Sequence, residues 1–281
     1  MILIADCGST KATWCLADRG RCIQTVCTGG INPYFQSEEE ISEGISNELF
    51  PRLEADRQDI EAVYFYGAGC VYEKTEVVWH IIKRHTEAAV VEVHSDLLAA
   101  ARGTCGESSG LVCVLGTGSN ACFYDGQRII QHVPSLGFIL GDEGGGAVLG
   151  KLLVSDLLKD MMGGELKEKF LKQFNLTPAQ IIDRVYRQPF PNRFLASLSP
   201  FLYQNLHEPA IRSLVLNSIK SFILRNLMKY DYRSYRANFV GSTAYYYKEI
   251  LLEAAVETGI RIGTVCRSPM EGLLAYHGIS G

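Results

Sequence analysis

The chain has 281 residues, of which 47% are hydrophobic and 21% charged, and its formal net charge is −4. This globular balance allows one large domain or two of ordinary size. Lys and Arg are spread along the chain without a basic arm, which argues against nucleic acid as a partner. The first residues run directly into a predicted strand, without the basic and small-residue regions of a signal peptide, and no apolar run could span a bilayer. We therefore expect a cytoplasmic protein with no membrane contact.

The nine cysteines are odd in number and include no C-x-x-C pair, so the spacing of a metal or iron–sulfur site is missing. Most of them lie inside apolar runs, namely Cys7, Cys15, Cys22, Cys113 and Cys122. We expect buried thiols that pack as small hydrophobic residues, in keeping with a reducing compartment.

The first part of the chain predicts a hairpin sheet followed by alternating helices and strands. Ser37 and Glu40 form a capping-box pattern that predicts the start of a helix running to about Leu53. The other predicted elements are strands at 1–6, 11–17, 22–27, 61–66 and 88–93, and helices at 73–86 and 96–103.

The second part repeats the hairpin pattern and then diverges. Strands are predicted at 110–115, 119–124, 127–133, 237–240 and 260–265, and residues 150–230 are mostly helical. The acidic pair Asp142-Glu143 is expected in the first turn of a long helix. Ser268 and Glu271 predict a capping box, with Pro269 as the first residue of a last helix that ends at Gly278.

Each half contains a turn of small and hydroxyl residues between two strands, Gly8-Ser9-Thr10 in the first and Gly116-Thr117-Gly118-Ser119 in the second. Small residues let the backbone approach an anion, and the N–H groups and hydroxyls of such a turn can point at phosphate oxygens. Two copies about a domain apart predict two half-molecules that close on one nucleotide.

Four motifs in this order carry a resemblance that covers essentially the whole chain. They are Asp6-x-Gly8-Ser9-Thr10-Lys11, Leu115-Gly116-Thr117-Gly118-Ser119-Asn120, Gly141-Asp142-Glu143-Gly144 and Phe239-Val240-Gly241-Ser242. The chain resembles the actin-like ATPase and sugar kinase superfamily, and more narrowly the N-acetylglucosamine kinase family grouped with the BadF/BadG/BcrA/BcrD ATPases. The resemblance implies an α/β protein with two ribonuclease H-like domains, an interdomain nucleotide cleft and a helical insertion in the second domain. It places the first domain at 1–104, joined by the C-terminal helix 269–281, and the second at 105–268.

The same resemblance implies an ATP-dependent kinase that phosphorylates the 6-hydroxyl of an N-acetylated amino sugar, of the N-acetylglucosamine or N-acetylmuramate type. ATP and Mg²⁺ are the implied cofactors, and ATP and a small amino sugar are the implied partners, while a homodimer is left open. The alternative is a BadF/BcrA-type regulatory ATPase that activates a partner enzyme, and a third interpretation is an actin-like scaffold.

The site residues follow from these motifs and from their positions at strand ends. Asp6 ends a buried strand and would hold hydrated Mg²⁺, and Asp96 follows a strand and would be the catalytic base. The implied phosphate-binding residues are Gly8, Ser9, Thr10, Lys11, Gly116, Thr117, Gly118, Gly241 and Ser242. The implied sugar-binding residues are Asn32, Thr117, Gly118, Ser119 and Asp142.

Each assignment has a simpler alternative. Asp6 and Asn32 could be ordinary turn residues, Lys11 a solvated strand residue, and Asp96 an acid that complements a helix dipole. Some family members have a stacking Trp where this chain has Leu136. For the run Tyr245–Tyr247, packing of aromatic side chains is favoured over adenine stacking.

Overall fold

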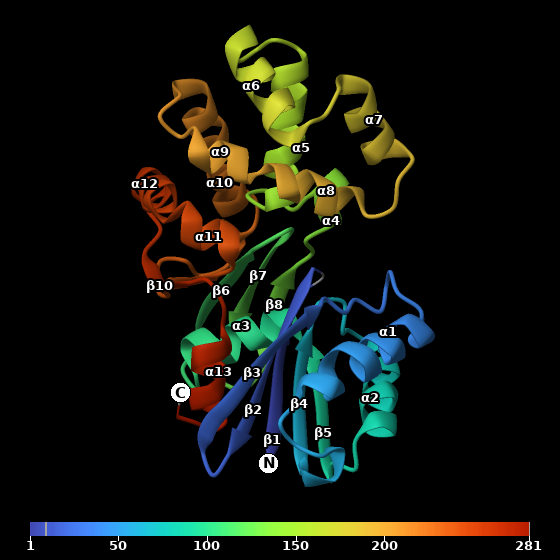
Figure 1. Cartoon of the computed structure of the whole chain (residues 1–281). Helices are drawn as coiled ribbons and strands as arrows, with labels where there is room; N and C mark the ends of the chain where they lie inside the picture. Colours follow the sequence, from blue (N-terminus) through green and yellow to red (C-terminus); the bar gives the residue numbers. More distant parts are fainter. Residues whose placement is uncertain (9, 281) are drawn as a thin grey trace. The chain divides into compact units, whose positions relative to one another are not determined.

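The computed structural model describes residues 1–8 and 10–280, and the chain divides into two compact units (Figure 1). Unit 1 comprises Met1–Ser109, Asp125–Arg128 and Ser268–Gly281, and unit 2 comprises Gly110–Tyr124 and Ile129–Arg267. Ser9, predicted to bind phosphate, lies outside the described residues. Within the described part of the chain, no helix combines the length and apolarity needed to cross a bilayer.

The sheet of unit 1 has the order β3-β2-β1-β4-β5. Its strands are β1 (Ile2–Cys7), β2 (Lys11–Asp18), β3 (Arg21–Gly29), β4 (Ala62–Gly67) and β5 (Val90–Ser95). The first three strands pair antiparallel as a meander, whereas β1, β4 and β5 run parallel. The carboxyl ends of β1, β4 and β5 therefore lie at one edge of this sheet, which is where α/β proteins place functional groups.

Both faces of this sheet are covered by helices. These are α1 (Glu38–Gly44), α2 (Glu73–His85), α3 (Asp96–Cys105) and α13 (Met270–Tyr276). Leu3 and Ala5 of β1 lie in a buried cluster with residues of α1 and α2, whereas Ile4 lies in a second cluster with residues of α3 and α13. Because neighbouring strand residues point to opposite faces, Asp6 lies on the same face as Ile4, the one that α3 and α13 cover.

The helix expected from Ser37 to about Leu53 is shorter than predicted. Its capping box forms, with Ser37 Oγ accepting from the Glu40 N–H at 3.2 Å, but α1 ends at Gly44. The chain continues as a π-helical turn, Ile45–Leu49, and a 3-10 turn, Phe50–Arg52. Pro51 lacks the backbone N–H that an α-helix continuing to Leu53 would need, so the last part of the predicted helix cannot form as α-helix.

Unit 2 repeats the same sheet with the order β10-β9-β6-β7-β8. Its strands are β6 (Gly110–Leu115), β7 (Ser119–Tyr124), β8 (Ile129–Val133), β9 (Ala237–Val240) and β10 (Ile262–Cys266). Again a three-strand meander precedes parallel strands, because β6 pairs antiparallel with β7 and parallel with β9. The repeat predicted from the two hairpins is thus a repeat of the whole sheet, and the expected α/β fold with two ribonuclease H-like domains is confirmed.

Helices between β8 and β9 form the expected insertion of unit 2. They are α4 (Gly137–Leu140), α5 (Gly146–Leu158), α6 (Gly164–Phe174), α7 (Pro178–Tyr186), α8 (Pro191–Leu198), α9 (Pro200–Gln204) and α10 (Pro209–Arg225). Two more helices, α11 (Ser242–Tyr246) and α12 (Lys248–Thr258), connect β9 to β10. The core of unit 2 joins apolar residues of α5, α10 and α12 to the sheet.

One expectation about the cysteines is wrong. Cys15 and Cys22 form a disulfide, although both were expected to be thiols. They lie on the neighbouring antiparallel strands β2 and β3, where the register shifts between Leu16 and Ala17. Cys7 and Cys70 are buried thiols, as predicted.

Candidate functional site

The candidate site residues of unit 1 gather at the carboxyl ends of its parallel strands. Asp6 lies on β1, opposite Thr13 of β2 and Tyr66 of β4. Asp96 directly follows β5 and is the first residue of α3. The charge of Asp6 raises the pKa of Asp96, so the two carboxyl groups interact across this edge.

The Asp6 side chain is held by Ser268, a residue that was predicted to be a helix N-cap. The Ser268 hydroxyl donates to Asp6 Oδ2 at 2.8 Å and accepts the backbone N–H of Met270 at 3.2 Å. Burial raises the pKa of Asp6, while the bond from Ser268 and the charge of Lys11 act in the opposite direction. The predicted Ser268–Glu271 capping box is therefore wrong, because the hydroxyl is directed to Asp6, and α13 begins at Met270 rather than Pro269.

Asp96 is the first residue of α3, and Ser95 is its N-cap, as expected. Ser95 Oγ accepts the Leu98 N–H at 3.3 Å. Burial is the main cause that raises the pKa of Asp96 to about 6, and the charge of Asp6 adds to it, whereas a bond from the Leu97 N–H opposes it. A carboxyl with a pKa near neutrality can hold and release a proton at cellular pH, as a general base must. The simpler alternative, an acid that only complements the helix dipole, stays open at this point.

The acids of this edge fit a hydrated Mg²⁺. Among the ion pairs of residues 1–8 and 10–280, none includes Asp6 or Asp96. No group of three or more His, Cys, Asp or Glu suited to a metal occurs in the same residues. Mg²⁺ typically keeps several waters and takes one or two carboxylates plus substrate phosphates, so a single carboxylate such as Asp6 suits it.

Backbone hydrogen bonds hold the described residues that follow β1. The Gly8 N–H donates to the Lys11 carbonyl at 2.9 Å, and the Thr10 carbonyl accepts the Gly30 N–H at 3.1 Å. Thr10 and Lys11 are exposed. Burial and the bond from Ser268 affect the pKa of Asp6 most, and the charge of Lys11 lowers it further, so Lys11 acts electrostatically on the site although its side chain is exposed.

The Asn32 loop is anchored beside β1. The Ile31 N–H donates to the buried Cys7 Sγ at 3.1 Å, and Asn32 itself is only 6% exposed. Asn32 Oδ1 accepts the Tyr34 N–H at 3.0 Å, which is the turn-forming contact that the simpler interpretation predicted. The side chain therefore shapes its own loop, and a contact of its amide with a sugar stays a prediction.

In unit 2 the predicted phosphate turn follows β6 and is bound by the start of α5. Gly146 donates its N–H to the Gly116 carbonyl and Ala147 to the Thr117 carbonyl, each at 2.8 Å. Gly145 approaches so closely that a Cβ there would lie 2.7 Å from the carbonyl carbon of Gly118. The glycine-rich segment before α5 thus supports the turn, which explains the need for small residues in both.

Asp142 lies against the same turn. Its Oδ1 accepts the Ser119 N–H at 3.1 Å, and its backbone has a φ of 55°. Burial raises the pKa of Asp142, and the charge of Glu143 adds to this while the Ser119 bond and Lys151 oppose it. Asp142 and Glu143 precede the long helix instead of forming its first turn, because α5 begins at Gly146.

The two acids of this segment have different surroundings. Glu143 pairs with Arg225 Nε at 2.8 Å, at the end of α10, and its side chain is 16% exposed. This ion pair fixes the segment to α10, whereas no ion pair of the described residues includes Asp142. Of the two, Asp142 is the one with a carboxylate available to a ligand.

The predicted adenosine motif meets the phosphate turn within unit 2. Gly241 has a φ of 121° and packs against the Leu115 carbonyl so closely that a Cβ would overlap it. Thr243 Oγ1 donates to the Gly116 carbonyl at 3.0 Å. Ser242 begins α11 and is exposed. Thr243 was not among the predicted site residues, although its place directly after Gly241-Ser242 was the available signal.

The three tyrosines after this motif differ in exposure: one is buried and two are exposed. Tyr247 is buried and its hydroxyl donates to the Ser199 carbonyl at 2.9 Å, so it packs as expected. Tyr245 and Tyr246 are 49% and 44% exposed. Leu136, where the resemblance leads one to expect a stacking Trp in some family members, is 62% exposed and directly precedes α4.

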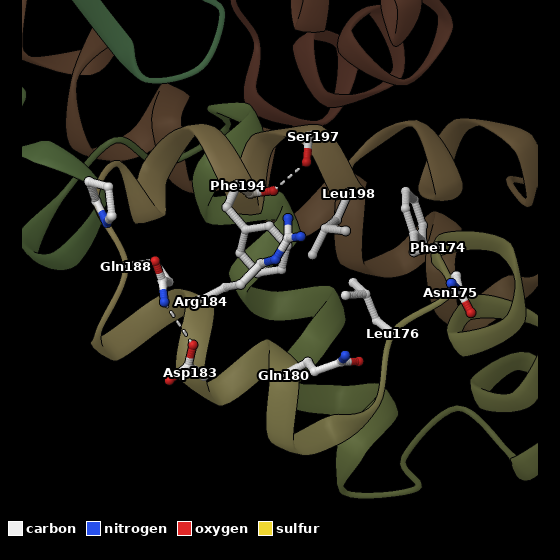
Figure 2. Close-up of a pocket in the computed structure, with 11 residues that line it drawn as sticks. Phe174, Asn175, Leu176, Gln180, Asp183, Arg184, Gln188, Phe194, Ser197 and Leu198 are labelled. Atoms are coloured by element: carbon white, nitrogen blue, oxygen red, sulfur yellow. Dashed lines mark hydrogen bonds between the residues drawn. The ribbon is translucent and has the colours of Figure 1, made fainter.

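A hollow of about 760 Å³ lies elsewhere in unit 2, among α6, α7 and α8 (Figure 2). It contains none of the predicted site residues. Some of its polar groups already have partners: Gln188 Nε2 donates to Asp183 Oδ2 at 3.0 Å, and the Arg184 guanidinium lies over the Phe194 ring. We therefore place the candidate site at the strand ends, where half-buried carboxylates and glycine turns occur, and not in this hollow.

Solved structures that are similar to this chain support its fold and indicate its family. A candidate N-acetylglucosamine kinase from Porphyromonas gingivalis is 46% identical, with 99% of each chain covered and a TM-score of 0.96. A candidate N-acetylglucosamine kinase from Chromobacterium violaceum is 16% identical over 98% of each chain, with a TM-score of 0.78. MreB5 of Spiroplasma citri bound to ADP is 10% identical, covering 98% of this chain and 95% of its own, with a TM-score of 0.59. No protein-family model and no curated protein matches the chain.

The repeated sheets, each with a glycine turn after its first strand, define an actin-like ATPase fold of two ribonuclease H-like domains. The two distant similarities support this fold alone. The similarity to the Porphyromonas gingivalis protein covers nearly every residue of both chains, and the chain therefore belongs to the family of that candidate N-acetylglucosamine kinase.

Proposed function

We propose that this protein is an ATP-dependent sugar kinase that transfers the γ-phosphoryl group to the 6-hydroxyl of an N-acetylated amino sugar, of the N-acetylglucosamine or N-acetylmuramate type. The observation that carries the proposal is Asp96, a carboxyl whose pKa is raised to about 6, beside the second acid Asp6 at one sheet edge. Membership in the family of a candidate N-acetylglucosamine kinase supports the choice of acceptor.

In this proposal Asp96 accepts the proton of the sugar 6-hydroxyl as its oxygen attacks the γ-phosphorus. The bond from that phosphorus to the β–γ bridging oxygen breaks, ADP leaves, and the proton passes from Asp96 to solvent. Phosphoryl transfer depends mainly on positioning and on neutralisation of charge. Mg²⁺, held through Asp6, supplies part of that neutralisation when bound.

The remaining residues bind and orient the two substrates. We assign the backbone of Gly8, Thr10, Gly116 and Gly118 to the phosphates, with Lys11 as an added positive charge. Ser119 and Asp142, joined by a hydrogen bond, are assigned to the sugar hydroxyls together with Asn32 and Thr117. Gly241 and Ser242 are assigned to the adenosine part of ATP.

The alternative function is a regulatory ATPase of the BadF/BcrA type, and a simple assay distinguishes it from a kinase. ADP release is measured with Mg²⁺-ATP alone and with a panel of amino sugars, including N-acetylglucosamine, N-acetylmuramate and unacetylated glucosamine. We expect turnover to rise strongly with an N-acetylated sugar, because the attacking hydroxyl is then present. Equal ADP release with every sugar and without sugar would reject the kinase and favour the ATPase.

A further inference from the structure

Ser268 is oriented so that its hydroxyl proton is directed to Asp6. The Met270 N–H donates to Ser268 Oγ at 3.2 Å, and Ser268 Oγ lies 2.8 Å from Asp6 Oδ2. A hydroxyl has one proton and two acceptor positions. Since the contact with Met270 uses an acceptor position and an ionised carboxylate cannot donate, Ser268 is the donor of the bond to Asp6.

The segment that carries Ser268 is itself fixed to the helix that carries Asp96. Pro269 packs on α3, where a Cβ on Gly103 would lie 2.7 Å from the Pro269 Cβ. One turn along α13, Gly272 contacts the Gly103 carbonyl so closely that no Cβ could be accommodated. Ser268 therefore projects from an anchored backbone and not from an independent loop.

Two contacts thus connect the Asp6 carboxylate to the helix that begins at Asp96. Asp96 starts α3, α3 packs on α13 through Gly103 and Gly272, and the residue two positions before α13 binds Asp6. This path lies within unit 1. A carboxylate with one oxygen held by an anchored donor has fewer rotamers available. It therefore loses less conformational entropy when it binds a cation.

We propose that Ser268 is a positioning residue for the metal site: its hydroxyl holds the Asp6 carboxylate in the orientation that binds hydrated Mg²⁺ with the nucleotide. This rests on the proposed role of Asp6 in the kinase. Loss of an outer partner of a metal-binding carboxylate typically lowers metal affinity about 10-fold to 100-fold. Ser268 does not contact substrate in this account and acts only through Asp6.

The test measures metal binding directly, without turnover. Mn²⁺ is titrated into the full-length protein with ADP and observed by electron paramagnetic resonance, since bound and aqueous Mn²⁺ give different signals. We expect Ser268→Ala to weaken Mn²⁺ binding about 10-fold or more. Ser268→Thr keeps the hydroxyl and should bind Mn²⁺ within about threefold of wild type.

Two further variants separate positioning from a general loss of stability. Ser37→Ala removes the capping hydroxyl of α1 and lowers stability, yet it should leave Mn²⁺ binding unchanged. Ser268→Cys keeps the shape of the side chain with a weaker donor, and it should weaken Mn²⁺ binding even if the alanine variant does not fold. Wild-type affinity in folded Ser268→Ala or Ser268→Cys would overturn the positioning role alone. Absence of Mn²⁺-ADP binding by the wild type would overturn the metal role of Asp6, and with it both proposals.

Discussion

The Asp142 carboxylate occupies the space that a side chain on Gly118 would need. A Cβ on Gly118 would lie 2.7 Å from Asp142 Oδ2, while Oδ1 of the same carboxylate accepts the Ser119 N–H at 3.1 Å. The acid assigned to the sugar is therefore held by the turn assigned to the phosphates. This contact explains why the turn has glycine at 118, independent of any need for unusual backbone angles.

Gly118→Ala should displace Asp142 and weaken acceptor binding. Overpacking a close contact costs about 1–3 kcal/mol, part of which the carboxylate relieves by moving. We expect the KM for the sugar to rise about 10-fold with a smaller change in the KM for ATP, measured by steady-state kinetics. Gly44→Ala is the matched control, because a Cβ there meets nothing within 4 Å. Unchanged sugar KM in Gly118→Ala would argue against the role of Asp142.

Asp96→Asn should abolish most turnover while nucleotide binding persists. Asn keeps the shape of the side chain but cannot accept the proton of the attacking hydroxyl. A general base contributes about 10²-fold to 10⁴-fold to the rate, so kcat should fall by that factor with little change in ATP affinity. Turnover near the wild-type rate would exclude Asp96 as the base and make Asp142 the next candidate.

The same substitution should stabilise the protein at neutral and alkaline pH. The pKa of Asp96 is raised from 3.8 to about 6 on folding, so its favourable contribution is complete below pH 4 and is lost as the pH rises through 6. At pH 8 we expect Asp96→Asn to raise the free energy of unfolding by about 1–3 kcal/mol, with the gain shrinking toward pH 4. Urea unfolding at both pH values measures this. A variant less stable than wild type at pH 8 would indicate that the helix-dipole interaction is the larger effect.

Activity should depend on the ionisation of Asp96. With its pKa raised to about 6, kcat/KM for the sugar should fall as the pH decreases through that value, because the protonated carboxyl cannot accept a proton. The residual activity of Asp96→Asn should lack this step. A wild-type profile that stays flat down to pH 5 would disagree with this assignment.

The sequence predicted those parts of the site that depend on local pattern. Strand alternation and turn chemistry located Asp6 at the end of β1 and Asp96 after β5, and the two similar hairpins predicted the repeated sheet. In each of these cases the determining residues lie within a few positions of one another.

Contacts between distant segments were not predictable in this way. Ser268 is 262 residues from Asp6, and its local pattern indicates a helix cap, so nothing near it in the sequence signals the bond to Asp6. The ion pair of Glu143 with Arg225 likewise depends on which elements pack together. The disulfide of Cys15 with Cys22 differs, because it joins neighbouring strands of one predicted hairpin and depends on their exact register. Such pairings follow from the tertiary fold, and sequence spacing alone does not specify them.

The destination of the γ-phosphoryl group tests the central claim most directly. ATP labelled at the γ-phosphate is incubated with the protein, Mg²⁺ and N-acetylglucosamine or N-acetylmuramate, and the labelled products are separated. We expect the label to appear in the 6-phosphate of an N-acetylated sugar, and Asp96→Asn to reduce this product greatly. Label found only in inorganic phosphate, in equal amount with and without sugar, would contradict it.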